Sequence, residues 1–295
     1  MSRPAVDHGP VGGSHGERSV GDTREAMNPP GGISRDELVA GLDLVRLAQD
    51  YVDRRSAASH LPAVTISGLA DLVVLLDEAY CRDVAEYFDH ALRLAYNARL
   101  ARLYDRMQWE NRLQYQAILD AGVEIEPWLG PGQPYRSSQE LVHRVRGTGT
   151  LYVYLTRDGH GPPGGASYHP LREPSGVTAQ GVELTHNDVF RAVHDVFGHV
   201  MFGNSFGPRG EFKATYCHMH MYPEVVHPIL FTEQIGQICW FFFGPHLLDR
   251  AGNLPKPGDP GYLPLGQRPY PEQKVFPFDH QYLDIFKRLF HVQES

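Results

Sequence analysis

Apolar side chains recur at helical spacing, three or four residues apart, along much of the chain. From Ser34, which forms a capping box with Glu37, the pattern predicts a helix that ends near Ser59, before a proline. The stretch 67–121 has the same periodicity and contains no proline, which predicts two or more consecutive helices. These segments predict a mainly α-helical protein.

The middle of the chain, residues 122–181, is rich in proline and glycine and has a different pattern. One run there, Thr150–Thr156 (TLYVYLT), combines β-branched and aromatic residues and predicts one or two strands. Residues 252–277 are again proline-rich, and an amphipathic helix is expected over 280–292. The expected fold is a single helical domain with a small β element.

The first 32 residues contain glycine, proline, serine and charged residues but almost no large apolar side chain. Such a segment cannot bury enough apolar surface to offset the entropy lost on ordering. We therefore expect residues 1–32 to be a disordered tail and residues 33–295 to form the folded domain.

Composition narrows the classes of partner. The formal net charge is −8, which disfavours non-specific binding to nucleic acid or to an anionic membrane. Three scattered cysteines and the lack of an apolar run of about 18 residues predict a cytoplasmic protein with no disulfide framework. The oligomeric state cannot be read from these features.

Histidine is the unusual residue in this chain, with 16 copies, several of them between positions 186 and 246. Two of these, His194 and His199, lie among apolar neighbours in a predicted helix that opens with a capping box of Thr185 and Asp188. Five residues apart, they would point about 140° apart on a regular α-helix. A shared metal ion therefore requires a wider turn such as a π-bulge, which Gly198 would favour.

A second helix, expected over 228–244, is almost wholly apolar but contains Glu233 and Gln234. A buried carboxylate is costly unless it is paired or binds a metal, so Glu233 should either form a salt bridge, for example with Arg191, or be a ligand. Two imidazoles and one carboxylate form the facial triad that holds non-haem Fe(II) with positions open for substrate and O₂.

Two segments resemble the aromatic amino acid hydroxylases, which are non-haem iron enzymes that use a pterin. His194 to His199 (HDVFGH) resembles the iron-binding His-Glu-x-x-Gly-His segment of that family, and FTEQIG, ending at Gly236, resembles its Phe-Ser-Gln-Glu-Ile-Gly helix. The similarity is confined to about residues 186–236. It implies a mononuclear Fe²⁺ centre, with O₂ and a small aromatic or amino-acid-like molecule as substrates and a pterin as cosubstrate.

The resemblance also implies roles for individual residues. His194, His199 and Glu233 would be the metal ligands, and Asp195 would be the acidic catalytic residue that follows the first histidine. Two departures leave the third ligand open. The Glu-Gln order is inverted relative to the family, so that Gln234 occupies the literal ligand position, and Asp195 is shorter than the family's glutamate.

Rival ligands lie between the two helices. Glu211 and His218 share one face of a helix expected over 210–222, and Glu211 is the next candidate for the third ligand. His218 suits a role as hydrogen-bond partner of a ligand, and Asp188 or Asp195 could likewise orient a ligand histidine.

Three classes of function fit these residues. The preferred one is an O₂-dependent, non-haem iron hydroxylase. The second is a zinc hydrolase that uses the same histidines, with Asp195 or Glu233 as general base. The third is a non-catalytic helical protein with structural histidines, which would be favoured if His194 and His199 diverged and each bonded to the backbone.

Overall fold

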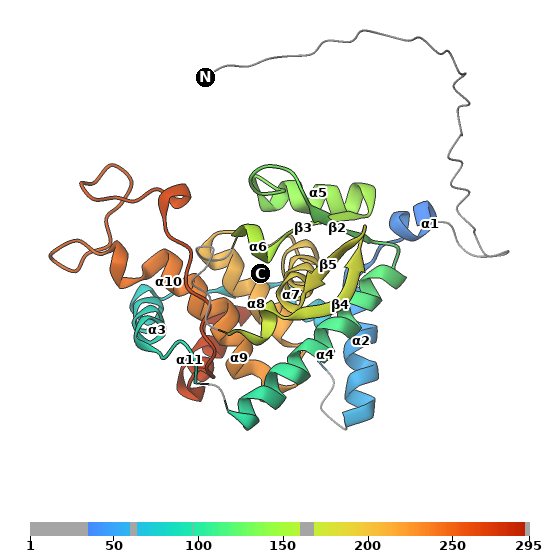
Figure 1. Ribbon diagram of the computed structural model, residues 1–295, viewed down its shortest axis with the longest axis horizontal. Helices are drawn as coiled ribbons and strands as arrows, with labels where there is room; N and C mark the ends of the chain where they lie inside the picture. The colour runs from blue at the N-terminus through green and yellow to red at the C-terminus, as the bar shows by residue number, and fades with distance from the viewer. Residues whose placement is uncertain (1–34, 60–63, 96, 160–167, 293–295) are drawn as a thin grey trace, which may run out of the picture. The chain divides into compact units, whose positions relative to one another are not determined.

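The computed structural model describes residues 35–59, 64–95, 97–159 and 168–292 (Figure 1). The described part is mainly helical with short strands, which confirms the expected fold class. The tail expected over residues 1–32 lies outside the described residues. The longer helices of the first half are α2 (Leu44–Ser59), α3 (Glu78–His90), α4 (Ala98–Asp120) and α5 (Ser138–Thr148).

The single helix expected over 34–59 is two helices, the short α1 (Arg35–Ala40) and α2. Gly41 ends α1, and the side chain of Asp43 accepts a hydrogen bond from the backbone N–H of Arg46 at 3.0 Å, which starts α2. Gly41 and the cap at Asp43 therefore divide the expected helix into two, although the apolar pattern is continuous.

The stretch 67–121 also divides at capping residues. A 3₁₀ turn (Ile66–Leu69) and strand β1 (Leu72–Val74) precede α3, which is capped by Asp77. Asn97 caps α4, accepting hydrogen bonds from the N–H groups of Arg99 and Leu100, both at 3.0 Å. The expected break into several helices is confirmed.

The strands form three two-stranded sheets among the described residues. Strand β2 (Glu124–Trp128) pairs in parallel with β3 (Thr150–Tyr154), the expected strand, with α5 as the crossover. Strand β4 (Pro174–Ala179) pairs with β5 (Val182–Thr185) as a hairpin. Strand β1 pairs with β6 (Phe290–Val292), so the helix expected over 280–292 ends early, as α11 (His280–Arg288).

The second half of the chain supplies the buried centre of the fold. It comprises α7 (His186–His194), α8 (Pro208–Met219), α9 (His227–Phe231) and α10 (Gln237–Phe243), with a π-helical segment after α7 and another between α9 and α10. Helix α4 packs on α7, and α3 packs on α10 (Figure 1). The hairpin β4–β5 leads directly into α7.

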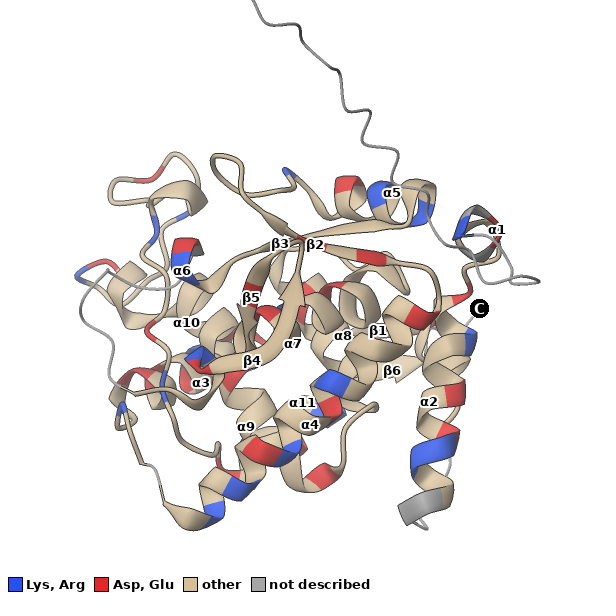
Figure 2. Cartoon of the chain, turned by 45° about the vertical axis from the view of Figure 1, so that its right-hand side comes forward, with Lys and Arg blue, Asp and Glu red and all other residues tan. Residues whose placement is uncertain are grey.

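Packing around the second π-helical segment is close. A Cβ atom on Gly236 would lie 2.8 Å from the rings of Phe88 and Phe278, so only glycine fits between them. Charged residues of both signs lie along the exposed helices, as Figure 2 shows for α2 and α4. No helix within the described ranges is long and apolar enough to span a membrane.

Candidate metal centre

The entry to α7 is fixed by the expected capping box. The Thr185 hydroxyl accepts from the Asp188 N–H at 3.1 Å, and the Asp188 carboxylate accepts from the Thr185 N–H at 2.8 Å. The same carboxylate accepts two hydrogen bonds from Thr156, at 2.7 and 2.6 Å. Asp188 therefore connects the start of α7 to Thr156, shortly after β3. The sequence had suggested that Asp188 could orient a ligand histidine, and the structure does not show this contact.

Directly after His194 the helix widens into a π-helix, Asp195–Val200, as the histidine spacing predicted. In a π-helix residues five apart come into line, and the rings of His194 and His199 lie with centroids 5.0 Å apart at 89°. Gly198 makes room for this arrangement, because a Cβ there would lie 2.9 Å from Cε1 of His194.

The carboxylate beside the two histidines is that of Glu211, in the first turn of α8. Its Oε2 lies 3.8 Å from Nε2 of His194 and 3.4 Å from Nε2 of His199. The ligand atoms of the three residues all lie within 4.8 Å of one another. Gly210 allows α8 to start close to the preceding loop, because a Cβ there would lie 2.0 Å from the carbonyl oxygen of Ser205.

Hydrogen bonds at the far side of the ring set the tautomer of His199. Its Nδ1 lies 3.0 Å from the backbone carbonyl oxygen of Asn204, which can only accept, so Nδ1 carries the proton. When the ring is neutral, its Nε2 lone pair therefore faces Glu211. Asn204 also donates from its side chain to the carbonyl oxygen of Gly198 at 2.7 Å, which braces the π-helix.

His194 is oriented by His218, which is fully buried on α8. Nε2 of His218 lies 2.7 Å from the amide oxygen of Gln114 and donates to it, since the Gln114 amide nitrogen donates to the carbonyl of Met221. Nδ1 of His218 must then accept, and it lies 3.3 Å from Nδ1 of His194. His194 therefore carries its proton on Nδ1, which leaves its Nε2 lone pair for a metal ion.

Gln234 is the second partner of His194. The end of its amide lies 2.5 Å from Nδ1 of His194, and its oxygen has no hydrogen-bond partner among the described residues. Turning the amide over places the Gln234 oxygen against the Nδ1–H group, which it then shares with Nδ1 of His218. Gln234 thus contacts the outer nitrogen of His194 and does not face the Nε2 atoms.

Glu233, the expected third ligand, lies in a separate buried cluster. It accepts hydrogen bonds from the Tyr104 hydroxyl at 2.6 Å and from the Gln237 amide at 3.2 Å. Nε2 of His169 lies 3.1 Å from the same carboxylate. The structure therefore places Glu211, and not Glu233, beside the two histidines. Arg191, its expected salt-bridge partner, donates instead to the carbonyl of Tyr154 at 3.0 Å.

Electrostatics within the cluster follow from burial and from Glu211. Burial would lower the pKa of His199, but the Glu211 carboxylate outweighs it and raises this pKa to about 9. At neutral pH Nε2 of His199 therefore carries a proton that faces Glu211, and this proton must leave before the nitrogen can bind a metal ion. Burial lowers the pKa of His194 and, well below its usual value, that of His218. Asp195 lies at the edge of the cluster, and burial raises its pKa although the charges of His199 and His194 oppose the shift.

The supporting residues were not predicted, except His218. Gln114, Asn204, Tyr104 and His169 carry no periodic or motif signal, and they reach the site only through the tertiary fold. Comparisons of the chain with protein-family models, with curated proteins and with solved structures gave no match.

Proposed function

We propose that this protein is a mononuclear non-haem Fe(II) enzyme that activates O₂ to hydroxylate a small aromatic or amino-acid-like substrate. The observation that supports the proposal is the convergence of two imidazole Nε2 lone pairs and one carboxylate oxygen, from His194, His199 and Glu211. This is the donor set of the facial triad. When bound there, Fe(II) would supply O₂ chemistry and open positions for substrate.

The surroundings of these donors fit a metal ion. In their neutral form both histidines are held in the tautomer that exposes Nε2, and each has a hydrogen-bond partner on its other nitrogen, as metal-bound imidazoles do. The side chain of Glu211 has no partner among the described residues other than the two histidines. Structural histidines would not need to direct two lone pairs and a carboxylate at one point, which argues against the non-catalytic alternative.

The neighbouring side chains would control access. The ring of Phe206 packs edge-on against His199 at 5.0 Å, and Phe190 lies 6.3 Å from the ring of His194. Such apolar walls limit water around the donors. Asp195, next in sequence to His194, is the residue we propose as the proton acceptor or donor at the open edge. The pterin cosubstrate is supported only by the sequence resemblance.

A zinc hydrolase is the second candidate, because zinc sites also use two histidines and one glutamate. The reaction supported by each metal distinguishes the oxygenase from the hydrolase. Anaerobic reconstitution with Fe(II), in parallel with Zn(II), should give one metal per chain in each case. Substrate-dependent O₂ consumption by the iron form alone supports the oxygenase, and hydrolysis by the zinc form without O₂ consumption would contradict it.

The ligand set is tested by a matched pair of variants, Glu211→Gln and Glu233→Gln. We expect Glu211→Gln to lose stoichiometric Fe(II), because a neutral amide replaces the carboxylate that lies beside both Nε2 atoms. Glu233→Gln should keep one Fe(II) per chain, although its unfolding free energy should fall by about 1–3 kcal/mol because an amide N–H then faces buried donors. The opposite result in metal quantification would return the third ligand to Glu233.

A further inference from the structure

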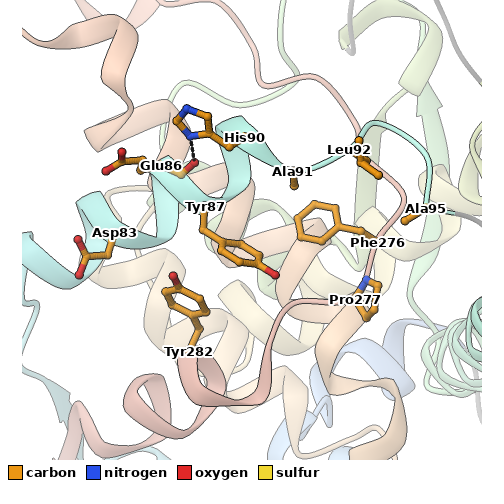
Figure 3. Close-up of a pocket in the computed structure, with 10 residues that line it drawn as sticks. All are labelled: Asp83, Glu86, Tyr87, His90, Ala91, Leu92, Ala95, Phe276, Pro277 and Tyr282. Atoms are coloured by element: carbon orange, nitrogen blue, oxygen red, sulfur yellow. Dashed lines mark hydrogen bonds between the residues drawn. The ribbon is translucent and has the colours of Figure 1, made fainter.

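An open cleft of about 680 Å³ lies on α3, where the segment 276–282 passes over the end of that helix (Figure 3). None of the metal-centre residues lines it. Its size falls in the range of small-molecule sites. The lining residues that matter for its chemistry are three rings and two carboxylates: Tyr87, Phe276, Tyr282, Asp83 and Glu86.

Aromatic rings form the wall of this cleft. The Tyr87 ring lies 4.9 Å from that of Tyr282 and 6.2 Å from that of Phe276, so it joins the other two (Figure 3). Tyr87 is 37% exposed, unusual for so large a side chain in an aromatic cluster. A ring face attracts cations through its quadrupole as well as apolar groups.

Acidic groups stand beside these rings. Asp83, Glu86 and Tyr87 follow one another at helical spacing on α3, and both carboxylates lie at the side of the cleft in Figure 3. Neither carboxylate has a hydrogen bond or an ion pair with any described residue. Burial raises the pKa of Tyr282, and Asp83 and Glu86 raise it further, so the field at this ring is negative.

The nearby cations are already occupied. Arg82 pairs with Glu78 at 2.6 Å, and Arg93 pairs with Glu272 at 2.8 Å. The ammonium group of Lys274 donates to three carbonyl oxygens at the end of α3, at 2.7, 2.7 and 3.0 Å. No lysine or arginine lines the cleft within the described ranges, and the lining His90 bonds through Nδ1 to the backbone carbonyl of Glu86 at 2.9 Å, so the two carboxylates are left for a ligand.

We propose that this cleft is a binding site for an organic ammonium ion that has an apolar body. The cationic nitrogen would lie against the rings of Tyr87 and Tyr282, beside Asp83 and Glu86, and the apolar body would lie along Phe276. The site is independent of the metal centre, and its occupation does not require the proposed oxygenase activity.

Benzyltrimethylammonium is a suitable probe, with benzyl alcohol as the neutral control. Titration of the full chain, followed by calorimetry and by ligand-observed NMR, should show saturable binding of the cation. Benzyl alcohol should bind at least about tenfold more weakly, since cation–π attraction contributes about 1–2 kcal/mol when partly desolvated. Equal affinity for the two compounds would overturn the proposal.

Variants locate the site. The double variant Asp83→Asn/Glu86→Gln and the variant Tyr87→Leu should each weaken binding of the cation about tenfold. The double variant Asp50→Asn/Glu224→Gln, which changes the net charge equally at exposed positions elsewhere, should not. Unchanged affinity in both cleft variants would contradict the proposal.

A last variant separates this site from the metal centre. His194→Ala should bind the probe as the unaltered protein does, whether or not it retains iron. If His194→Ala loses the probe while its circular dichroism shows an intact fold, the ammonium ion binds at the metal centre and the cleft proposal is wrong.

Discussion

The hydrogen-bond partner at Nδ1 of each histidine determines which ring nitrogen is available at the proposed metal centre. His199 is fixed by a carbonyl oxygen, whereas His194 is fixed by a chain of side chains that runs through His218 to Gln114. The second arrangement is the more fragile, because it depends on the tautomer of a residue that is not itself a ligand.

This dependence predicts that His218→Phe lowers the affinity for Fe(II), by up to about 10–100-fold, because one of the two acceptors of the His194 Nδ1–H group is lost and only Gln234 remains, while the ring volume is kept. His218→Asn, whose oxygen can replace Nδ1 as acceptor, should recover part of the affinity. Competition with a colorimetric chelator measures both.

The matched control is His220→Phe, because His220 bonds to the carbonyl of Tyr216 at 2.8 Å and does not contact the cluster. It should retain the affinity for Fe(II) of the unaltered protein. Equal losses in the His218 and His220 variants would mean that the effect comes from packing of α8 and not from the tautomer of His194.

Local sequence signals were sufficient for part of the site. The five-residue step and Gly198 predicted the π-helix, and Thr185 and Asp188 predicted the start of α7. The carboxylate of the cluster was ranked second, because Glu211 was only the next candidate after Glu233. Glu233 looked unpaired in its apolar helix, since its partner Tyr104 lies 129 residues away in the sequence. Glu211 has no such local signal, and only the packing of α8 brings it to the histidines.

At the scale of the element, the geometry of one helix determines how the two histidines are placed relative to each other. The π-helix Asp195–Val200 aligns two histidines that an α-helix would separate, and Gly198 is the residue that lets the first ring lie against the backbone of the second turn. Apolar periodicity predicted where helices occur in this chain. It missed the division of α1 from α2, which depends on a single glycine and a single cap.

Gly198→Ala should therefore damage the centre more than the fold. Its Cβ would meet the His194 ring at 2.9 Å and the Cβ of Ala214 at 3.3 Å, so the ring must move away from the shared point. We expect at least about tenfold weaker Fe(II) binding, in line with other changes that disturb ligand orientation. Fe(II) competition titration checks this.

Gly147→Ala is the control for the glycine effect itself. Gly147 lies within α5, and nothing would be within 4 Å of an added Cβ. This variant should raise the unfolding free energy by about 0.5–1 kcal/mol, through lower entropy of the unfolded chain, without changing metal affinity. A Gly198→Ala protein that binds iron normally would show that the ring position is not critical.

At the scale of the whole molecule, buried neutral histidines couple stability to pH. His227 illustrates this coupling: its Nε2 bonds to the carbonyl of Met219 at 3.0 Å, and its Nδ1 has no hydrogen-bond partner in the part of the chain described. Burial lowers the pKa of His227 to about 4, because protonation would place an unsatisfied N–H group in the core.

The folded-state pKa lies below the unfolded value of about 6.5, so the unfolded chain takes up the proton first. Stability from His227 is present above about pH 6.5 and is lost as the pH falls toward 4, by up to roughly 3 kcal/mol. Urea unfolding of chelator-treated protein at pH 7, 6 and 5 should show this decline. His227→Gln should be less stable at pH 7 but decline less, and parallel declines would contradict the assignment.

A π-helix has one residue more in its turn than an α-helix, and in the segment after His194 this additional residue changes the direction of the side chains that follow. Removing one residue, for example Val196, would let the helix close into regular α-helical turns. The chain could fold with that deletion, yet the histidines would then be four residues apart. One residue thus sets the register of the two histidines. A sequence search for histidine pairs at α-helical spacing would miss this pair.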